Sequence, residues 1–239
     1  MALKQEIVSD PSIDDELDEE EIVERIFQAV VEQRLPPGTK LSESALCEAF
    51  GVGRMRIRRS LLLLSSRQVV DLQANRGAYV ASPTTAQARE VFETRQALEP
   101  AIVQLALQRA TDADIEALED HLKAEHDAHA ADHRHEAIRL SGQFHLMLAQ
   151  IANNAIMFRL MKELVMRTSL IIGIYGAPSI DNCHDTEHAQ ITAAFKARDA
   201  DAAARLMVQH LNHIAAQLNL DRKADPSVSL QDLFGKKAG

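Results

Sequence analysis

The sequence predicts a mainly α-helical protein in two parts: three helices and a β-hairpin, followed by a bundle of helices alone. Good helix formers such as Ala, Leu, Glu, Gln and Arg dominate most of the 239 residues. Apolar residues recur at helical spacing along most of the chain. The exception is 69–81, where two short β-prone runs flank an Asn/Gly turn and predict a hairpin. A Ser-Pro-Thr stretch at 82–84 then marks the boundary between the two parts.

Three helices with clear boundary signals make up the first part. Two prolines and a glycine at 36–38 end the first helix, because proline lacks the amide hydrogen that a helix interior uses. Ser42 is a good N-cap for the second helix, and a Gly-Val-Gly turn separates it from the third. We place the helices at 20–33, 42–50 and 54–66, the hairpin strands at 69–73 and 78–81, and a disordered acidic tail at 1–19. This order of elements is that of a winged helix-turn-helix domain, here spanning 20–82.

The second part, residues 83–222, shows helical patterns only and predicts an all-α helical-bundle domain. Pro100 lies inside its first helix, where we expect a kink. The polar tail at 223–239 is expected to be loose, although Leu230, Leu233 and Phe234 could dock on the rest of the chain. We place the helices of this part at 85–109, 111–128, 132–152, 155–173, 185–197 and 200–220.

The distribution of charge matters more than its total. The net charge is −9, which taken alone argues against nucleic acid, but residues 51–80 hold six arginines and a single acidic residue. In a helix-turn-helix the second helix lies in the major groove with its first residues at base edges. The alternative is a merely solvated helix face, for which interspersed acids would serve better. The predicted DNA contacts are Arg54, Arg56, Arg58 and Arg59 on the third helix, and Arg76 and Gly77 at the tip of the hairpin, or wing.

Several classes of protein are not favoured by the sequence. The longest apolar runs are far shorter than a membrane span requires, so no membrane partner is expected. The N-terminus is acidic and has no apolar core of the kind found in a secretory signal. Cys47 and Cys183 are far apart and have no metal-ligand spacing to one another. Reduced thiols in a cytoplasmic protein fit these features best.

All ten histidines fall in the helical second part. Helical phase points His145, His188 and His210 inward, whereas the charge-rich stretch with His126, His129, His133 and His135 is expected to be exposed. A single inward histidine is more often a hydrogen-bonded core residue than a metal ligand. Three that converge from separate helices favour a metal site, because bundle cores are where such sites form. Three neutral imidazoles would leave a coordination position open for water or a ligand carboxylate.

The first part resembles the GntR family of bacterial regulators over about residues 20–82. The matching residues are Pro36-Pro37-Gly38-Thr39-Lys40-Leu41-Ser42-Glu43, Phe50-Gly51-Val52-Gly53-Arg54 and Asn75-Arg76-Gly77. The resemblance implies DNA contacts by Arg54, Arg58 and Gly77. Gly53, Met55-Arg56 and Arg59-Ser60 depart from the family pattern, and Ser44 stands where some members have a DNA-contacting arginine. These departures place the family's usual operator preference in question here.

The helical part resembles the FadR C-terminal ligand-binding (FCD) domain over about residues 88–218. The matching residues are Arg95-Gln96-Ala97-Leu98-Glu99, Phe144-His145, Asn153-Asn154, Glu187-His188 and His210-Leu211. Many members bind a divalent metal through an Asp and three His, which correspond to His145, His188 and His210, with Ser141 in place of the Asp. A divalent ion such as Zn or Ni is therefore possible. The resemblance implies that Arg95 clamps an effector carboxylate near Ser141; the alternative for Arg95 is an ion pair with Glu99 at i+4.

These features predict a transcriptional regulator rather than an enzyme. A homodimer would place two recognition helices on operator DNA, and a small organic acid in the helical domain would change operator occupancy. The main alternative is a His-rich metal-dependent hydrolase, against which no inward Glu or Asp near the three histidines stands out as a general base. A third possibility is an interaction protein whose basic helix binds an acidic partner.

Overall fold

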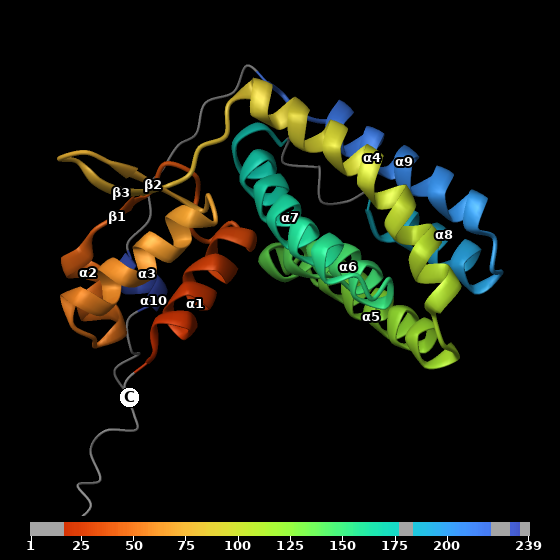
Figure 1. Ribbon diagram of the computed structural model, residues 1–239, viewed down its shortest axis with the longest axis horizontal. Coiled ribbons are helices and arrows are strands. Elements are labelled where there is room, and N and C mark those ends of the chain that lie inside the picture. The colour runs from red at the N-terminus through yellow and green to blue at the C-terminus, as the bar shows by residue number, and fades with distance from the viewer. Residues whose placement is uncertain (1–16, 177–183, 221–229, 235–239) are drawn as a thin grey trace, which may run out of the picture.

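The computed structural model describes residues 17–176, 184–220 and 230–234, which form a small mixed domain and a larger helical bundle (Figure 1). The small domain contains the helices α1 to α3 and a three-stranded sheet, and the bundle contains α4 to α9. Among the described residues, no helix is long and apolar enough to cross a membrane.

The small domain has the predicted winged helix-turn-helix order. Asp18 caps α1 through a capping box with Glu21, so the helix begins at Glu19, inside the stretch expected to be a disordered tail; residues 1–16 lie outside the described residues. Gly51, with φ of +69°, ends α2 in the left-handed conformation that the tight turn requires. The elements are α1 (Glu19–Val31), β1 (Lys40–Leu41), α2 (Glu43–Phe50), α3 (Arg54–Ser66), β2 (Val70–Gln73) and β3 (Gly77–Val80).

One strand of this domain was not predicted. The antiparallel sheet has the order β1-β3-β2, and the two-residue β1 pairs Lys40 with Tyr79 and Leu41 with Ala78. A pair of residues carries no periodicity, and the pairing joins positions that are far apart along the chain. No local pattern in the sequence therefore predicted β1.

The bundle confirms the predicted helices, with ends that shift by a few residues. Capping boxes at Thr84 and Thr111 start α4 and α5, and the Asn154 side chain caps α7. The first helix is continuous through Pro100, where the sequence suggested a kink. The helices are α4 (Thr85–Arg109), α5 (Asp112–Ala130), α6 (Arg134–Ile151), α7 (Ala155–Tyr175), α8 (His184–Lys196) and α9 (Ala200–Ala216).

Helix α7 belongs to the cores of both domains. Leu164, Val165 and Ile171 lie in the core of the bundle, whereas Met166 and Leu170 are buried among the apolar residues of the small domain. Figure 1 shows α7 running close to α1, on the side of the bundle that faces the small domain. The two domains are therefore in direct contact through one helix and not only through the connection at 81–84.

The expectation of a loose C-terminal tail is wrong for Leu230–Phe234, which form a short helix, α10. Leu230 is buried in the core of the small domain, and the Phe234 ring lies 4.9 Å from that of Phe50 on α2. Burial of these apolar side chains offsets the cost of ordering the segment. This segment, for which the sequence allowed docking on the rest of the chain, thus packs on the small domain.

Candidate functional site: a three-histidine cluster, its cavity and a basic helix

Three buried histidines meet in the interior of the bundle. His145 on α6, His188 on α8 and His210 on α9 are each at most 3% exposed. One ring nitrogen of each lies within 4.8 Å of the others, and the Nε2 atoms of His188 and His210 are 3.2 Å apart. The inward orientation predicted from helical phase is confirmed for all three.

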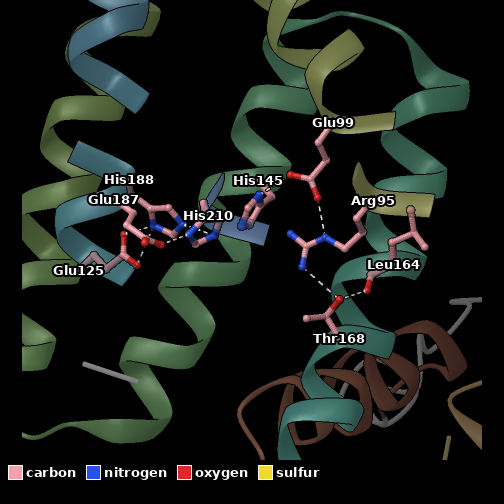
Figure 2. A network of polar contacts seen from close by, with 9 residues as sticks. All are labelled: Arg95, Glu99, Glu125, His145, Leu164, Thr168, Glu187, His188 and His210. Atoms are coloured by element: carbon pink, nitrogen blue, oxygen red, sulfur yellow. Dashed lines mark hydrogen bonds and ion pairs between the residues drawn. The ribbon is translucent and has the colours of Figure 1, made fainter. Parts of the chain in front are cut away.

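Each of these imidazoles has its other nitrogen bound to a carboxylate (Figure 2). His145 Nδ1 donates to Glu99 at 2.6 Å, His188 Nδ1 to Glu125 at 3.0 Å and His210 Nδ1 to Glu187 at 2.7 Å. Because a carboxylate can only accept, the proton of each neutral ring resides on Nδ1, and Nε2 presents a lone pair. Three lone pairs then point into one space, as the donors of a metal site do.

These carboxylates correct the expectation that no inward acid lies near the histidines. All three already accept hydrogen bonds from imidazoles, so they orient the rings and are not free bases. Signals for them existed in the sequence. Glu125 lies seven residues after Leu118 and hence on the same buried face of α5, and Glu187 directly precedes His188. A charged residue in a polar stretch, such as Glu125, is ordinarily exposed, and here the packing of α6 and α8 against α5 covers it.

The charge of the cluster suits a divalent cation. Burial raises the pKa of Glu99, but the charge of Arg95 and the hydrogen bonds from His145 and Arg95 outweigh this and bring it to about 2. Burial lowers the pKa of His145 to about 4, so this ring is neutral near pH 7. With neutral imidazoles, the three carboxylates face a single guanidinium and leave two negative charges. A divalent ion on the three Nε2 atoms would balance them, so the donors fit the metal implied by the resemblance.

Arg95 joins this cluster to a cavity. Its Nε donates to Glu99 at 2.5 Å and one terminal nitrogen donates to Thr168 at 3.1 Å, so the ion pair considered as an alternative is present. The other terminal nitrogen is buried and has no hydrogen-bond partner. Arg95, Ser141 and His145 all line a cavity of about 40 Å³ between α6 and α7. The structure therefore brings the predicted effector residues together with one of the three histidines.

His129 was expected to lie in an exposed stretch, and this is wrong. The side chain is half-buried in the last turn of α5, and it lines the same cavity. His126, His133 and His135 are exposed as expected. The difference arises because α5 packs along α6, which covers the face that Glu125 and His129 share.

The third helix presents the predicted basic face. Ile57, Leu61 and Leu64 bury one side of α3, whereas Arg54, Arg58 and Arg59 are exposed on the opposite side and its flanks. Arg58 is bound to both oxygens of Glu43 at 2.9 Å, and Arg59 forms an ion pair with Glu19. Such exposed pairs contribute little stability and can exchange for phosphate.

The other three predicted DNA contacts are Arg56 on α3 and Arg76 and Gly77 at the wing. Arg56 is turned toward the start of α1, where it donates to the carbonyl of Leu17, because it lies on the side of α3 that packs against that helix. In this structure Arg56 therefore links α3 to the start of α1, and its predicted contact with DNA stays a prediction. At the wing, Gly77 has φ of +98° and no atom near its missing Cβ, and Arg76 is exposed beside it. A backbone this open can approach a duplex closely.

Comparison with known families and proteins agrees with this geometry. Residues 18–80 match the family model described as bacterial regulatory proteins, gntR family, and residues 90–213 match the FCD domain. The HTH-type transcriptional repressor RspR of Escherichia coli is 28% identical over 199 residues, which cover 81% of this chain and 86% of that protein. The HTH-type transcriptional regulator LutR of Bacillus subtilis is 28% identical over 203 residues, covering 75% and 91%.

Solved structures share the fold. E. coli McbR/YncC superposes with a TM-score of 0.74 at 19% identity, over 83% of this chain and 95% of that chain. A transcriptional regulator described as a putative GntR from a Rhodococcus species gives 0.71 at 23% identity, over 83% and 96%. At these identities the likeness concerns the arrangement of helices and strands.

The role of Glu99 predicts a specific loss of stability. Glu99→Gln should lower the free energy of unfolding at pH 7 by about 3–5 kcal/mol, because it leaves Arg95 buried without its counter-charge. The folded pKa of about 2 lies below the ordinary 4.5, so the stability from Glu99 is present above pH 4.5 and is lost as the pH falls toward 2. Urea denaturation at pH 7 and pH 3 measures both effects.

A control for this substitution is Glu136→Gln, which removes an exposed partner of Arg139 on α6. It should cost less than about 1 kcal/mol at either pH. Equal losses for the two substitutions would contradict the assignment of Glu99 as the central counter-charge.

Proposed function

As a member of the GntR family of bacterial regulatory proteins with an FCD domain, this chain is a DNA-binding transcriptional regulator, and we propose that a compact organic acid beside a metal-binding histidine cluster controls its operator binding. The observation that carries the proposal is the set of three imidazoles held by Glu99, Glu125 and Glu187, with their Nε2 lone pairs converging. A hydrolase is not favoured, because the matching proteins are regulators and each nearby carboxylate is already bound.

The proposed metal ligands are His145, His188 and His210. Imidazole nitrogen suits Zn and Ni, and the carboxylates behind the rings raise the basicity of the ligands. A divalent ion there supplies a Lewis-acidic position open to water or to an effector oxygen. Ser141 lines the cavity and is a poor ligand for such an ion, so three imidazoles form the protein's whole proposed donor set.

Arg95 is the proposed anchor for the effector carboxylate. Its unpartnered terminal nitrogen is the kind of buried donor that an anionic oxygen satisfies, and its Nε is already fixed by Glu99. Much of the remaining wall is apolar, including Ile138, Val165 and Ile172. The cavity's small volume favours an acid of few carbon atoms.

Ser169 is the proposed link between this cavity and the DNA-binding domain. It directly follows Thr168, the partner of Arg95, and its hydroxyl donates to the carbonyl of Val31 at the end of α1. The carbonyl of Ser169 accepts a hydrogen bond from Gln33 at 3.3 Å, and Ser169 and Val31 both line the cavity. An effector that shifts Arg95 thus acts through α7 on the first helix of the DNA-binding domain.

The proposed DNA contacts are Arg54, Arg58 and Arg59 on the recognition helix α3, with Arg76 and Gly77 at the wing. A homodimer would place two such helices in major grooves about 34–36 Å apart on a pseudo-palindromic operator. We propose that the protein acts in this form in the cytoplasm, where the operator is.

Substitution of the recognition arginines tests the DNA site. Arg54→Ala and Arg58→Ala should each weaken binding to the operator by about 1–3 kcal/mol if the arginine contacts a base. If the arginine contacts a phosphate, the slope of the logarithm of the binding constant against the logarithm of the salt concentration should fall by about 1. The measurement is retardation of the intergenic DNA upstream of the chain's own gene, with random DNA as competitor at two salt concentrations. Arg89→Ala, an exposed arginine on α4, is the control and should leave binding unchanged. Full binding by both recognition variants would refute the assignment.

Metal binding is tested by calorimetry of chelator-treated protein with Zn²⁺ and Ni²⁺. His188→Ala should abolish binding, and Glu125→Gln should weaken it about 10- to 100-fold, because the carboxylate orients His188. His126→Ala, an exposed histidine on α5, should bind as the parent chain does. A parent chain that takes up neither ion would rule out the proposed site.

The link through Ser169 predicts a variant that binds effector without responding to it. For the acid that changes operator affinity most among two- to four-carbon carboxylic acids, Ser169→Ala should retain the affinity for the acid. The change in operator affinity should shrink toward none, because the coupling is carried by the contact with Val31. Ser66→Ala, an exposed serine hydroxyl at the end of α3, is the control and should respond normally. An undiminished response in Ser169→Ala would show that the coupling runs elsewhere.

A further inference from the structure

We propose that His129 is a second effector-binding residue in the cavity, and that the effector is a compact organic acid with another oxygen function besides its carboxylate. The inference rests on the proposed effector site at Arg95 and specifies its ligand.

The cavity has a second buried polar atom without a hydrogen-bond partner, in addition to that of Arg95. Among the described residues, six buried side-chain nitrogen or oxygen atoms have no hydrogen-bond partner, and two of them, Arg95 Nη2 and His129 Nε2, belong to residues lining the same cavity. Leaving such an atom unpaired is unfavourable, because the group has lost its hydrogen bonds to water. Two of these atoms around one cavity are expected where a ligand supplies both partners.

The placement of His129 follows from the packing of α5. His129 lies one turn after Glu125, so the same helix face carries the counter-charge of His188 and then reaches the cavity. Ala128 beside it is buried against Ala137 and Leu140 of α6, which keeps this end of α5 close to the cavity wall. His129 therefore lies next to a buried contact between α5 and α6.

The two unpartnered atoms define the chemistry of the ligand. The guanidinium of Arg95 can only donate and is positively charged, so it selects a carboxylate. His129 Nε2 donates or accepts according to its tautomer, and a hydroxyl or a second carboxylate oxygen can satisfy it. Apart from Ser141, the other polar side chains of the wall are already engaged: Thr168 and Ser169 donate to backbone carbonyls, and His145 donates to Glu99. Much of the rest is apolar, including Val31, Ile138 and Ile214. A hydroxy acid or a short dicarboxylic acid fits this wall better than a simple fatty acid.

Three acids that differ at one carbon test this inference. Propionate, 3-hydroxypropionate and malonate have three carbons each. Their third carbon is a methyl group, a hydroxymethyl group and a carboxylate, respectively. Calorimetry with zinc-loaded full-length protein should show that 3-hydroxypropionate or malonate binds at least about tenfold more tightly than propionate, a difference of about 1.4 kcal/mol. In His129→Leu this preference should fall below about twofold, while the affinity for propionate is retained.

Two further variants keep the result interpretable. His129→Gln keeps a side chain that can donate and accept hydrogen bonds and should recover part of the preference, whereas His126→Leu, at an exposed position on the same helix, should leave it intact. Melting temperatures verify that each variant is folded. Equal affinities for the three acids in the parent chain, or an unchanged preference in His129→Leu, would overturn the role of His129 alone. A parent chain that binds none of the acids would overturn both this role and the effector site at Arg95.

Discussion

A single buried carboxylate, that of Glu99, connects the parts of this regulator that must act together. One of its oxygens accepts from Arg95 and the other from His145, in a region where all three side chains are at most 3% exposed. Each partner would be unfavourable there without it: the guanidinium would be an unpaired buried charge, and the imidazole would lose its orientation. The proposed metal site and the proposed effector site thus share one counter-charge. A change in charge or position at either site would therefore alter the interactions at the other.

The connection to DNA depends on α7 being common to two cores. A helix that is buried on one side by the bundle and on another by the small domain cannot move without repacking both, because protein interiors are as densely packed as crystals. Thr168 and Ser169 stand on this helix at the point where the cavity meets α1. In the proposed coupling, a shift of a fraction of an ångström near Arg95 would be transmitted to the DNA-binding domain through this helix.

The basic helix is partly neutralised by the chain's own acids. Glu43 holds Arg58, Glu19 holds Arg59, and Glu20 holds Arg67 at the end of the same helix. These pairs are exposed, so their rupture costs little, and a phosphate can take the place of each carboxylate. These ion pairs hold the guanidinium groups on the helix, so a chain of net charge −9 can still present a basic helix for the proposed DNA contacts.

Local signals in the sequence were sufficient to predict most helices, the hairpin, and the inward orientation of His145, His188 and His210. These signals are caps, glycine turns and a period of 3.6 residues, and each of them acts over a few positions of the chain. They were insufficient for β1, for α10, for the partners Glu125 and Glu187, and for His129. Each of these depends on which helix or strand packs against it: a two-residue strand has no period, and a charged or polar side chain in a polar stretch is buried only when a distant helix covers it. The sequence by itself determined the family, most of the helices, the hairpin and the three inward histidines. Only the tertiary structure decided how these histidines are held and where the cavity meets the DNA-binding domain, because contacts between distant segments follow from packing and not from local pattern.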